Sequence, residues 1–361
     1  MLWISPKKPF FAKSTYCVSI SHTMKHLAFL LLFFLTIQCL PAQTENVAPS
    51  TIFEKLTTTE GIELTLESDF TTFVGQKKTN NYLPGTLRTK DGKSYTVEVR
   101  PRGRYRRKVS QIPPIKIRFD EKGLQAENLD TLNEIKIALP GVHNDQGNEL
   151  IVKEYLAYRM FEKVSDVHFR ARLVKLTLID TNKKGFGKKK LYSIFIEDEE
   201  EVARRLAGTP EDEFGIKIDR FEQQQAALVV MFQYLIGNTD WDLPMHRNVE
   251  LIKKNENEKM IVLPYDFDFS GLVSAPYASP SSESGLKTVR DRYLMPFGVD
   301  DEALKSATNV LKTREKDFYQ ICRSKYLSNE TSIAMTNFLE SYFNNMKGKD
   351  LAPTVMVEKK E

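Results

Sequence analysis

The sequence predicts an α+β fold of two lobes, an antiparallel β-rich N-lobe with one inserted helix and a mostly helical C-lobe. Two observations carry this prediction. Up to residue 197, short segments alternate apolar and polar side chains, which is the pattern of half-buried strands. From residue 198 onward, apolar residues recur at helical spacing. We therefore place the N-lobe at residues 61–197 and the C-lobe at residues 198–350.

The N-lobe is expected to be a meander of five or six strands. Strands are predicted at residues 62–66, 95–100, 113–119, 134–139, 170–179 and 191–197. The third of these begins at Pro113 and Pro114, because proline cannot donate to the interior of a ladder. The inserted helix is predicted from about Asn148 to Lys163, where Ile151 and Tyr155 share one face by their four-residue spacing.

The C-lobe is built around one apolar helix. Residues 221–236 are predicted helical, and their last portion is apolar nearly all round, which is typical of a buried axis. Gly237 follows as a C-cap glycine would. A short hairpin is predicted at 249–252 and 260–263, and further helices at 198–206, 301–324 and 330–346.

The N-terminus has the layout of a secretory signal peptide. A short basic segment, Met24-Lys25-His26, precedes an apolar run over residues 27–37, and Ala42 offers a cleavage site. We predict a signal peptide at 24–42, a misassigned start at 1–23, a tether at 43–60 and a loose tail at 351–361. A lipoprotein anchor at Cys39 is disfavoured, because Gln38 is too large for the usual lipobox.

An exported protein of the periplasm or the extracellular space, without a transmembrane anchor after cleavage, is the expected result. Cys322 is then the one cysteine left, so no intrachain disulfide can form. The net charge of +4 over 361 residues is small, and nothing global favours nucleic acid as a partner.

Two acidic loops between Gly237 and Gly271 hold the candidate chemistry. The first contains Asp240 and Asp242 and continues to Asn248, and the second contains Asp266 and Asp268. Phosphoryl transfer requires an acidic residue near the acceptor and Asn or Asp oxygens on the metal, in this order along the chain. These carboxylates could instead cap or turn the chain, as Asx residues commonly do.

Basic candidates lie in the N-lobe. Lys116 lies mid-strand and is predicted to contact phosphates, paired with Glu154 of the inserted helix or, in reserve, Glu149. Arg102 is the preferred phosphate ligand in the dense basic run of residues 100–108. The alternative is that both segments form solvated faces.

His246 stands apart from these sets. A single histidine near carboxylates could suit zinc or iron, but with no second histidine in this segment we expect His246 to orient the loop.

This succession of a β-rich lobe, a hinge near Glu197 and a helical lobe with acidic loops is the layout of a protein-kinase-like fold. The ordered motifs over most of residues 61–275 resemble the CotH kinase-like family. The motifs are Arg102-Gly103, Lys116, the helix at 148–163, Tyr192 to Glu197, Asn238-Thr239-Asp240 to Asn248, and Tyr265-Asp266-Phe267-Asp268. The acidic loops are also similar to those of HipA-type and phosphatidylinositol-kinase-like enzymes.

The resemblance implies an atypical kinase that binds ATP with Mg²⁺ and phosphorylates a protein, here one of the cell envelope. It implies Asp240 as the catalytic aspartate, Asn248 as a metal ligand and Asp266 as the metal-bridging aspartate. Lys116 would contact phosphates and Glu197 would lie beside the nucleotide. Asp242 is the alternative to Asp240, because Asn248 lies farther from Asp240 than in the usual kinase spacing.

Two other functions stay open. The chain could be a catalytically degenerate binding or assembly protein of the cell envelope. It could also be a metal-dependent hydrolase that uses Asp240, Asp242, His246 and Asp266.

Overall fold

The computed structural model describes Leu2 and residues 49–255 and 258–347. The predicted signal peptide, the residues upstream of it apart from Leu2, and the tail at 351–361 lie outside these ranges, as does Cys39. The predicted start, leader and tail therefore stay predictions.

Seven strands form a closed barrel in the order β1-β2-β3-β4-β5-β7-β6. They are β1 (Ile62–Ser68), β2 (Leu83–Thr89), β3 (Ser94–Pro101), β4 (Ile115–Phe119), β5 (Glu134–Ala138), β6 (Ala171–Asp180) and β7 (Lys188–Ile196). Neighbouring strands are antiparallel except at the closure, where β1 and β6 run parallel from Ile62 opposite Val174 to Ser68 opposite Asp180. The predicted two-lobed kinase-like fold with an antiparallel N-lobe sheet is wrong, because this sheet is mixed and closed.

The sequence pattern missed β2 and the closure for identifiable reasons. Pro84 and Gly85 lie inside β2, and both residue types are depleted in strands. The β1–β6 pairing joins segments far apart in the chain, and alternation within a strand says nothing about its partner. Closure gives every barrel strand two neighbours, so this sheet has no exposed edge.

Four short helices surround the barrel: α2 (Ile52–Leu56), α3 (Phe70–Gly75), α4 (Tyr105–Val109) and α5 (Glu121–Ala126). The barrel interior holds one apolar core, to which Phe53 of α2 and Phe70 of α3 contribute. Helix α2 lies within the segment predicted as a tether. Its N-cap Thr51 and Glu54 form a capping box, which satisfies two otherwise unpaired backbone N–H groups.

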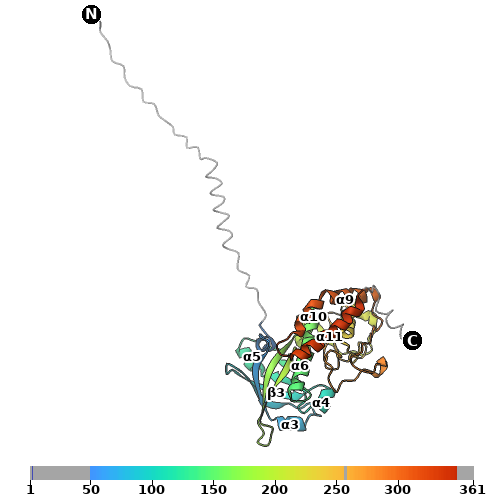
Figure 1. Ribbon diagram of the computed structural model, residues 1–361. Coiled ribbons are helices and arrows are strands. Elements are labelled where there is room, and N and C mark those ends of the chain that lie inside the picture. Colours follow the sequence, from blue (N-terminus) through green and yellow to red (C-terminus); the bar gives the residue numbers. More distant parts are fainter. Residues whose placement is uncertain (1, 3–48, 256–257, 348–361) are drawn as a thin grey trace. The chain divides into compact units, whose positions relative to one another are not determined.

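The remaining helices build a second core. They are α6 (Asp145–Phe161), α7 (Glu199–Arg205), α8 (Gln223–Ile236), α9 (Asp301–Thr313), α10 (Glu315–Cys322) and α11 (Asn329–Met346). Helix α6 packs against β6 and β7 on one side and against α10 on the other, and α10 lies beside α11 (Figure 1). Arg314 separates α9 from α10, where the sequence predicted one continuous helix.

Helix α8 is buried almost throughout and ends at Gly237, whose φ of 65° is left-handed, so the predicted C-cap is confirmed. The predicted hairpin is also confirmed as β9 (Val249–Lys253) and β10 (Ile261–Pro264), and β8 (Thr209–Glu211) adds a third strand beside β9. Two 3₁₀ turns, η1 (Ile218–Arg220) and η2 (Ser282–Ser284), complete the described elements. In the described ranges, no helix combines the length and the apolarity needed to span a membrane.

Candidate functional site

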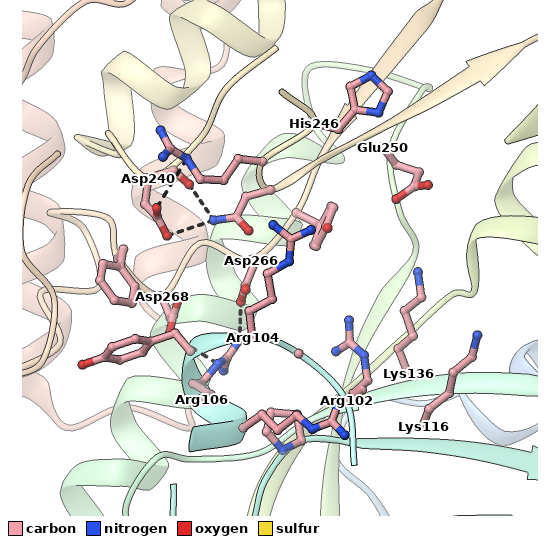
Figure 2. Close-up of a pocket in the computed structure, with 18 of the residues that line it drawn as sticks. Arg102, Arg104, Arg106, Lys116, Lys136, Asp240, His246, Glu250, Asp266 and Asp268 are labelled. Atoms are coloured by element: carbon pink, nitrogen blue, oxygen red, sulfur yellow. Dashed lines mark hydrogen bonds and ion pairs between the residues drawn. The ribbon is translucent and has the colours of Figure 1, made fainter. Parts of the chain in front are cut away.

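A pocket of about 670 Å³ opens between the end of the barrel and the loops that flank β9 and β10. Basic side chains from the barrel and α4 line one wall, and acidic and amide side chains from the loops line the other (Figure 2). The charged or amide lining residues include Arg102, Arg104, Arg106, Lys116, Lys136, Asp240, His246, Arg247, Asn248, Glu250, Asp266 and Asp268. This pocket therefore collects most of the predicted site residues.

Asp240 is positioned by the end of α8 and by Asn248. The left-handed Gly237 turns the chain out of the helix, and the Asn238 side chain accepts a 3.0 Å hydrogen bond from the Asp240 N–H. Asn248, with φ of 54°, donates its amide N–H to the carboxylate Oδ2 of Asp240 at 3.0 Å. The Asn248 amide oxygen accepts no hydrogen bond from the described residues. Burial raises the pKa of Asp240 above its ordinary value.

Asp266 lies two residues after the end of β10 and has a left-handed φ of 59°, which turns its carboxylate into the pocket. Its N–H donates to the hydroxyl of Tyr158 on α6 at 2.9 Å. One carboxylate oxygen, Oδ1, accepts a hydrogen bond from Arg106. The other oxygen, Oδ2, has no protein hydrogen bond in the described residues and is available to a ligand.

Arg106 forms the buried base of the pocket. Its guanidinium donates to both oxygens of Glu154, at 2.8 and 2.9 Å. Figure 2 shows its other two contacts, with Asp268 at 3.3 Å and with Asp266. Burial lowers the pKa of Arg106, but Asp268, Glu154 and Asp266 outweigh it and keep the group charged. The basic run of residues 100–108 drew attention to this segment, but no sequence feature distinguished Arg106 within it.

Glu154 therefore pairs with Arg106, and the predicted Lys116–Glu154 pair is wrong. Lys116 instead lies 2.5 Å from Glu134 and 3.1 Å from Asp198. Burial lowers the pKa of Lys116, and Asp198 and Glu199 raise it by more. Figure 2 shows Lys116 beside Lys136, on the side of the pocket away from Asp240. Glu149, the predicted reserve, instead accepts hydrogen bonds from Ser328 and Thr331.

Arg102 and Arg104 are the open cationic groups of the basic wall. Gly103 between them has φ of 82°, a left-handed turn that glycine adopts without strain. Neither guanidinium forms a hydrogen bond or ion pair with another described side chain, whereas Arg106, Lys116 and Lys136 are all paired. Lys136 stands in no recognisable motif, and within the basic run of residues 100–108 the sequence analysis preferred Arg102 and did not single out Arg104.

The remaining predicted residues lie elsewhere or are already engaged. Asp242 accepts a 2.7 Å hydrogen bond from the Met245 N–H and does not line the pocket. Glu197 is fully buried, bonded to Arg170 and Arg205, and does not line it either. Asp268 lines the pocket but is buried, and it accepts a 3.0 Å hydrogen bond from the Tyr277 hydroxyl.

Within the described ranges, no three His, Cys, Asp or Glu side chains converge to hold a metal ion. The set of Asp240, Asp242, His246 and Asp266 thus does not form the metal centre that a hydrolase would need. His246 packs its ring against Phe214 with the ring centroids 5.2 Å apart.

No family model matches this sequence, and no curated protein matches it. Among solved structures, the chain has a distant likeness to the Helicobacter pylori proinflammatory kinase CtkA. The identity is 10% and the TM-score 0.33, over 74% of this chain and 88% of that one. A likeness at this level carries no argument about the function of this chain, and the resemblance to the CotH kinase-like family is not supported by these comparisons.

Proposed function

We propose that this protein is a phosphotransferase that binds ATP with Mg²⁺ in this pocket and phosphorylates a hydroxyl group of a protein. One observation carries the proposal: the open guanidinium groups of Arg102 and Arg104 share a single pocket with the oxygens of Asp240, Asn248 and Asp266. Arginine is suited to bind phosphate oxygens in a bidentate manner. Carboxylate and amide oxygens are suited to bind Mg²⁺.

The residues present fit a magnesium–polyphosphate complex better than a free metal ion. Mg²⁺ is usually bound by one or two carboxylates, with the rest of its shell from phosphates and water. Oδ2 of Asp266 and the amide oxygen of Asn248 accept no hydrogen bond from the described residues and are available for it, whereas Asp268 is bonded to Arg106 and Tyr277. Bound there, Mg²⁺ would neutralise charge on the phosphate oxygens.

Asp240 is the proposed general base. It would accept the proton of the acceptor hydroxyl, whose oxygen forms the new bond to the γ-phosphorus while the bond from that phosphorus to the β-bridging oxygen breaks. Asn248 holds the carboxylate through Oδ2, and Arg247 lies 3.7 Å from its Oδ1. Arg102 and Arg104 would hold the phosphates, and ADP leaves with the bridging oxygen.

A non-catalytic binding protein is the second candidate, and the Arg106 cluster favours it. Arg106 already contacts Asp266, the carboxylate that would bind metal. If this contact persists with ligand present, the pocket would bind anions through Arg102 and Arg104 without supporting transfer.

Thermal unfolding of residues 43–361 with and without nucleotide tests the proposal. Magnesium and ATP should stabilise the protein by about 2.7 kcal/mol at a ligand concentration of 100 Kd. Asp266→Asn should remove the magnesium dependence, because the substitution takes a negative charge from the metal site. Asp240→Asn should keep nucleotide binding but lose transfer to protein substrates. Asp219→Asn, at an exposed position outside the pocket, is the matched control.

The outcomes separate the two candidates. If no nucleotide stabilises the protein, with or without Mg²⁺, the result contradicts the phosphotransferase. The binding protein is supported if ATP stabilises the chain without Mg²⁺, if Arg102→Met and Arg104→Met weaken that stabilisation, and if no phosphate is transferred to protein.

A further inference from the structure

We propose that the protein acceptor docks beside Asp240 through an apolar side chain flanked by basic residues. The docking surface comprises residues 211–214 and 245–246, and we call it the Phe214 surface. This inference rests on the proposed function, since it names the class of polypeptide that would present its hydroxyl to Asp240.

Two large apolar side chains are exposed on this surface. Phe214 is 61% and Met245 59% exposed to solvent. Their loops are joined, because the Gly215 N–H donates to the Pro244 carbonyl at 2.8 Å and the Phe214 ring packs against His246. A single exposed apolar residue is ordinary, but two on adjoining loops, next to the pocket-lining His246, indicate a binding surface.

The loop that carries Met245 has a fixed shape. The Met245 N–H donates to the Asp242 carboxylate at 2.7 Å, and Asp242 and Arg247 exchange backbone hydrogen bonds of 2.9 and 3.1 Å. His246 adopts a left-handed φ of 47° inside this turn. A loop whose backbone is already held in this way loses little backbone entropy when a partner covers it.

The Phe214 surface adjoins the proposed catalytic base. His246, Arg247 and Asn248 line the same pocket as Asp240, and Arg247 lies 3.7 Å from the Asp240 carboxylate. Strand β8 pairs with β9 so that Glu211 lies opposite Leu251, shortly after Asn248. A peptide on this surface could therefore extend a neighbouring serine, threonine or tyrosine to Asp240.

The charge of the surface selects the partner. Glu211, Asp212 and Glu213 are consecutive, and none forms an ion pair with another described residue. All three carboxylates act electrostatically on the His246 ring, which packs against Phe214. An apolar segment with lysine or arginine neighbours complements this surface, and an acidic segment is repelled by it.

The test measures the binding of three fluorescently labelled peptides to the folded protein. The basic–apolar peptide carries one serine, one leucine and three lysines; one relative replaces the leucine by glycine, and another replaces the lysines by glutamates. Anisotropy measures their binding to wild type, to Phe214→Ser with Met245→Ser, and to Asp212→Lys with Glu213→Lys. Ile333→Ser on α11, 60% exposed and outside the pocket, is the matched apolar control.

The basic–apolar peptide should bind wild type more tightly than either relative. Loss of both apolar side chains should weaken its binding on the order of tenfold, as expected for uncovering a buried apolar side chain. The lysine variant should prefer the glutamate peptide, and Ile333→Ser should match wild type. With ATP present, the same variants should raise the KM for the peptide and leave kcat and the nucleotide-induced thermal shift unchanged.

The docking surface is overturned if both double variants bind the basic–apolar peptide as tightly as wild type does. It is also overturned if wild type prefers the glutamate peptide. The two proposals fail separately. If nucleotides cause no thermal shift but peptide binding still depends on Phe214 and Met245, the result overturns the phosphotransferase and supports the surface. If phosphate is transferred to the peptides and neither double variant changes that transfer, the result supports the phosphotransferase and overturns the surface.

Discussion

Arg106 is a buried guanidinium whose neighbours are three carboxylates, Glu154, Asp266 and Asp268. Glu154 is 1% and Asp268 3% exposed, so each depends on Arg106 for compensation of its charge. Burial raises the pKa of both carboxyl groups, and Arg106 opposes that rise. This residue therefore fixes the base of the pocket while leaving one oxygen of Asp266 open.

Replacement of Arg106 should be costly. Arg106→Met leaves Glu154 and Asp268 buried without their cation, and we expect it to lower the free energy of unfolding by about 3–5 kcal/mol. Urea unfolding measures the loss. Arg104→Met, two residues away at an exposed position with no ion pair among the described residues, should change stability by less than about 0.5 kcal/mol.

The pairing itself can be checked with a second substitution. Adding Glu154→Met to Arg106→Met removes one uncompensated carboxylate and should recover part of the lost stability. A loss with Arg106→Met no larger than with Arg104→Met would contradict the cluster, and so would strict additivity with Glu154→Met.

At the scale of elements, α2 is attached to α7 by a polar cluster. The Thr51 hydroxyl donates to Glu201 at 2.6 Å, and Arg170 contacts Glu201, Glu197 and Glu54. Burial raises the pKa of Glu201 to about 7. The second oxygen of Glu201 is buried and has no hydrogen-bond partner among the described residues, which fits a neutral carboxyl group.

This cluster makes stability depend on pH. The folded protein keeps the Glu201 proton up to about pH 7, whereas the unfolded chain loses it near the ordinary value of 4.5. Between these values the folded state binds more protons, so the contribution of Glu201 is full below pH 4.5 and is lost as pH rises through 7. We expect Glu201→Gln to match wild type at low pH and to exceed its stability at pH 8.

Urea unfolding at a series of pH values checks this expectation. Glu200→Gln, the exposed neighbour, is the control and should follow wild type throughout. An identical pH profile for Glu201→Gln and wild type would show that Glu201 is ionised in the folded protein.

At the scale of the whole molecule, the parallel pairing of β1 with β6 closes the barrel. Leu66 and Leu178 are opposite one another in this register, and both are fully buried in the barrel core. Leu235 is equally buried but belongs to the helical core. The two cores give a direct test of the closure.

Leu66→Ala and Leu178→Ala should each cost about 2–5 kcal/mol, because each leaves a cavity in a closed core. Since the side chains share one environment, the double variant should depart from additivity by about 0.5–3 kcal/mol. Leu66→Ala with Leu235→Ala should be additive to within about 0.5 kcal/mol. Additive behaviour of both pairs in denaturant unfolding would contradict the closure.

Local pattern determined the individual elements well. Alternation located six of the seven barrel strands, and the apolar run before Gly237 located α8, because side-chain periodicity is a property of neighbouring residues. It also placed Asp240, Asn248 and Asp266 on short loops after buried elements, and the structure brings them into one pocket. The predicted export depends on residues outside the described ranges and stays a prediction.

Only the tertiary structure decided which elements and side chains meet. Contacts between distant segments set the β1–β6 pairing and make Arg106, not Lys116, the partner of Glu154. They also keep Glu197 and Asp242 out of the pocket. Periodicity records which face of an element is buried, but it does not record what that face is buried against. The chain by itself therefore determined its strands, helices and acidic loops, and packing determined the closed barrel and the electrostatics of the pocket.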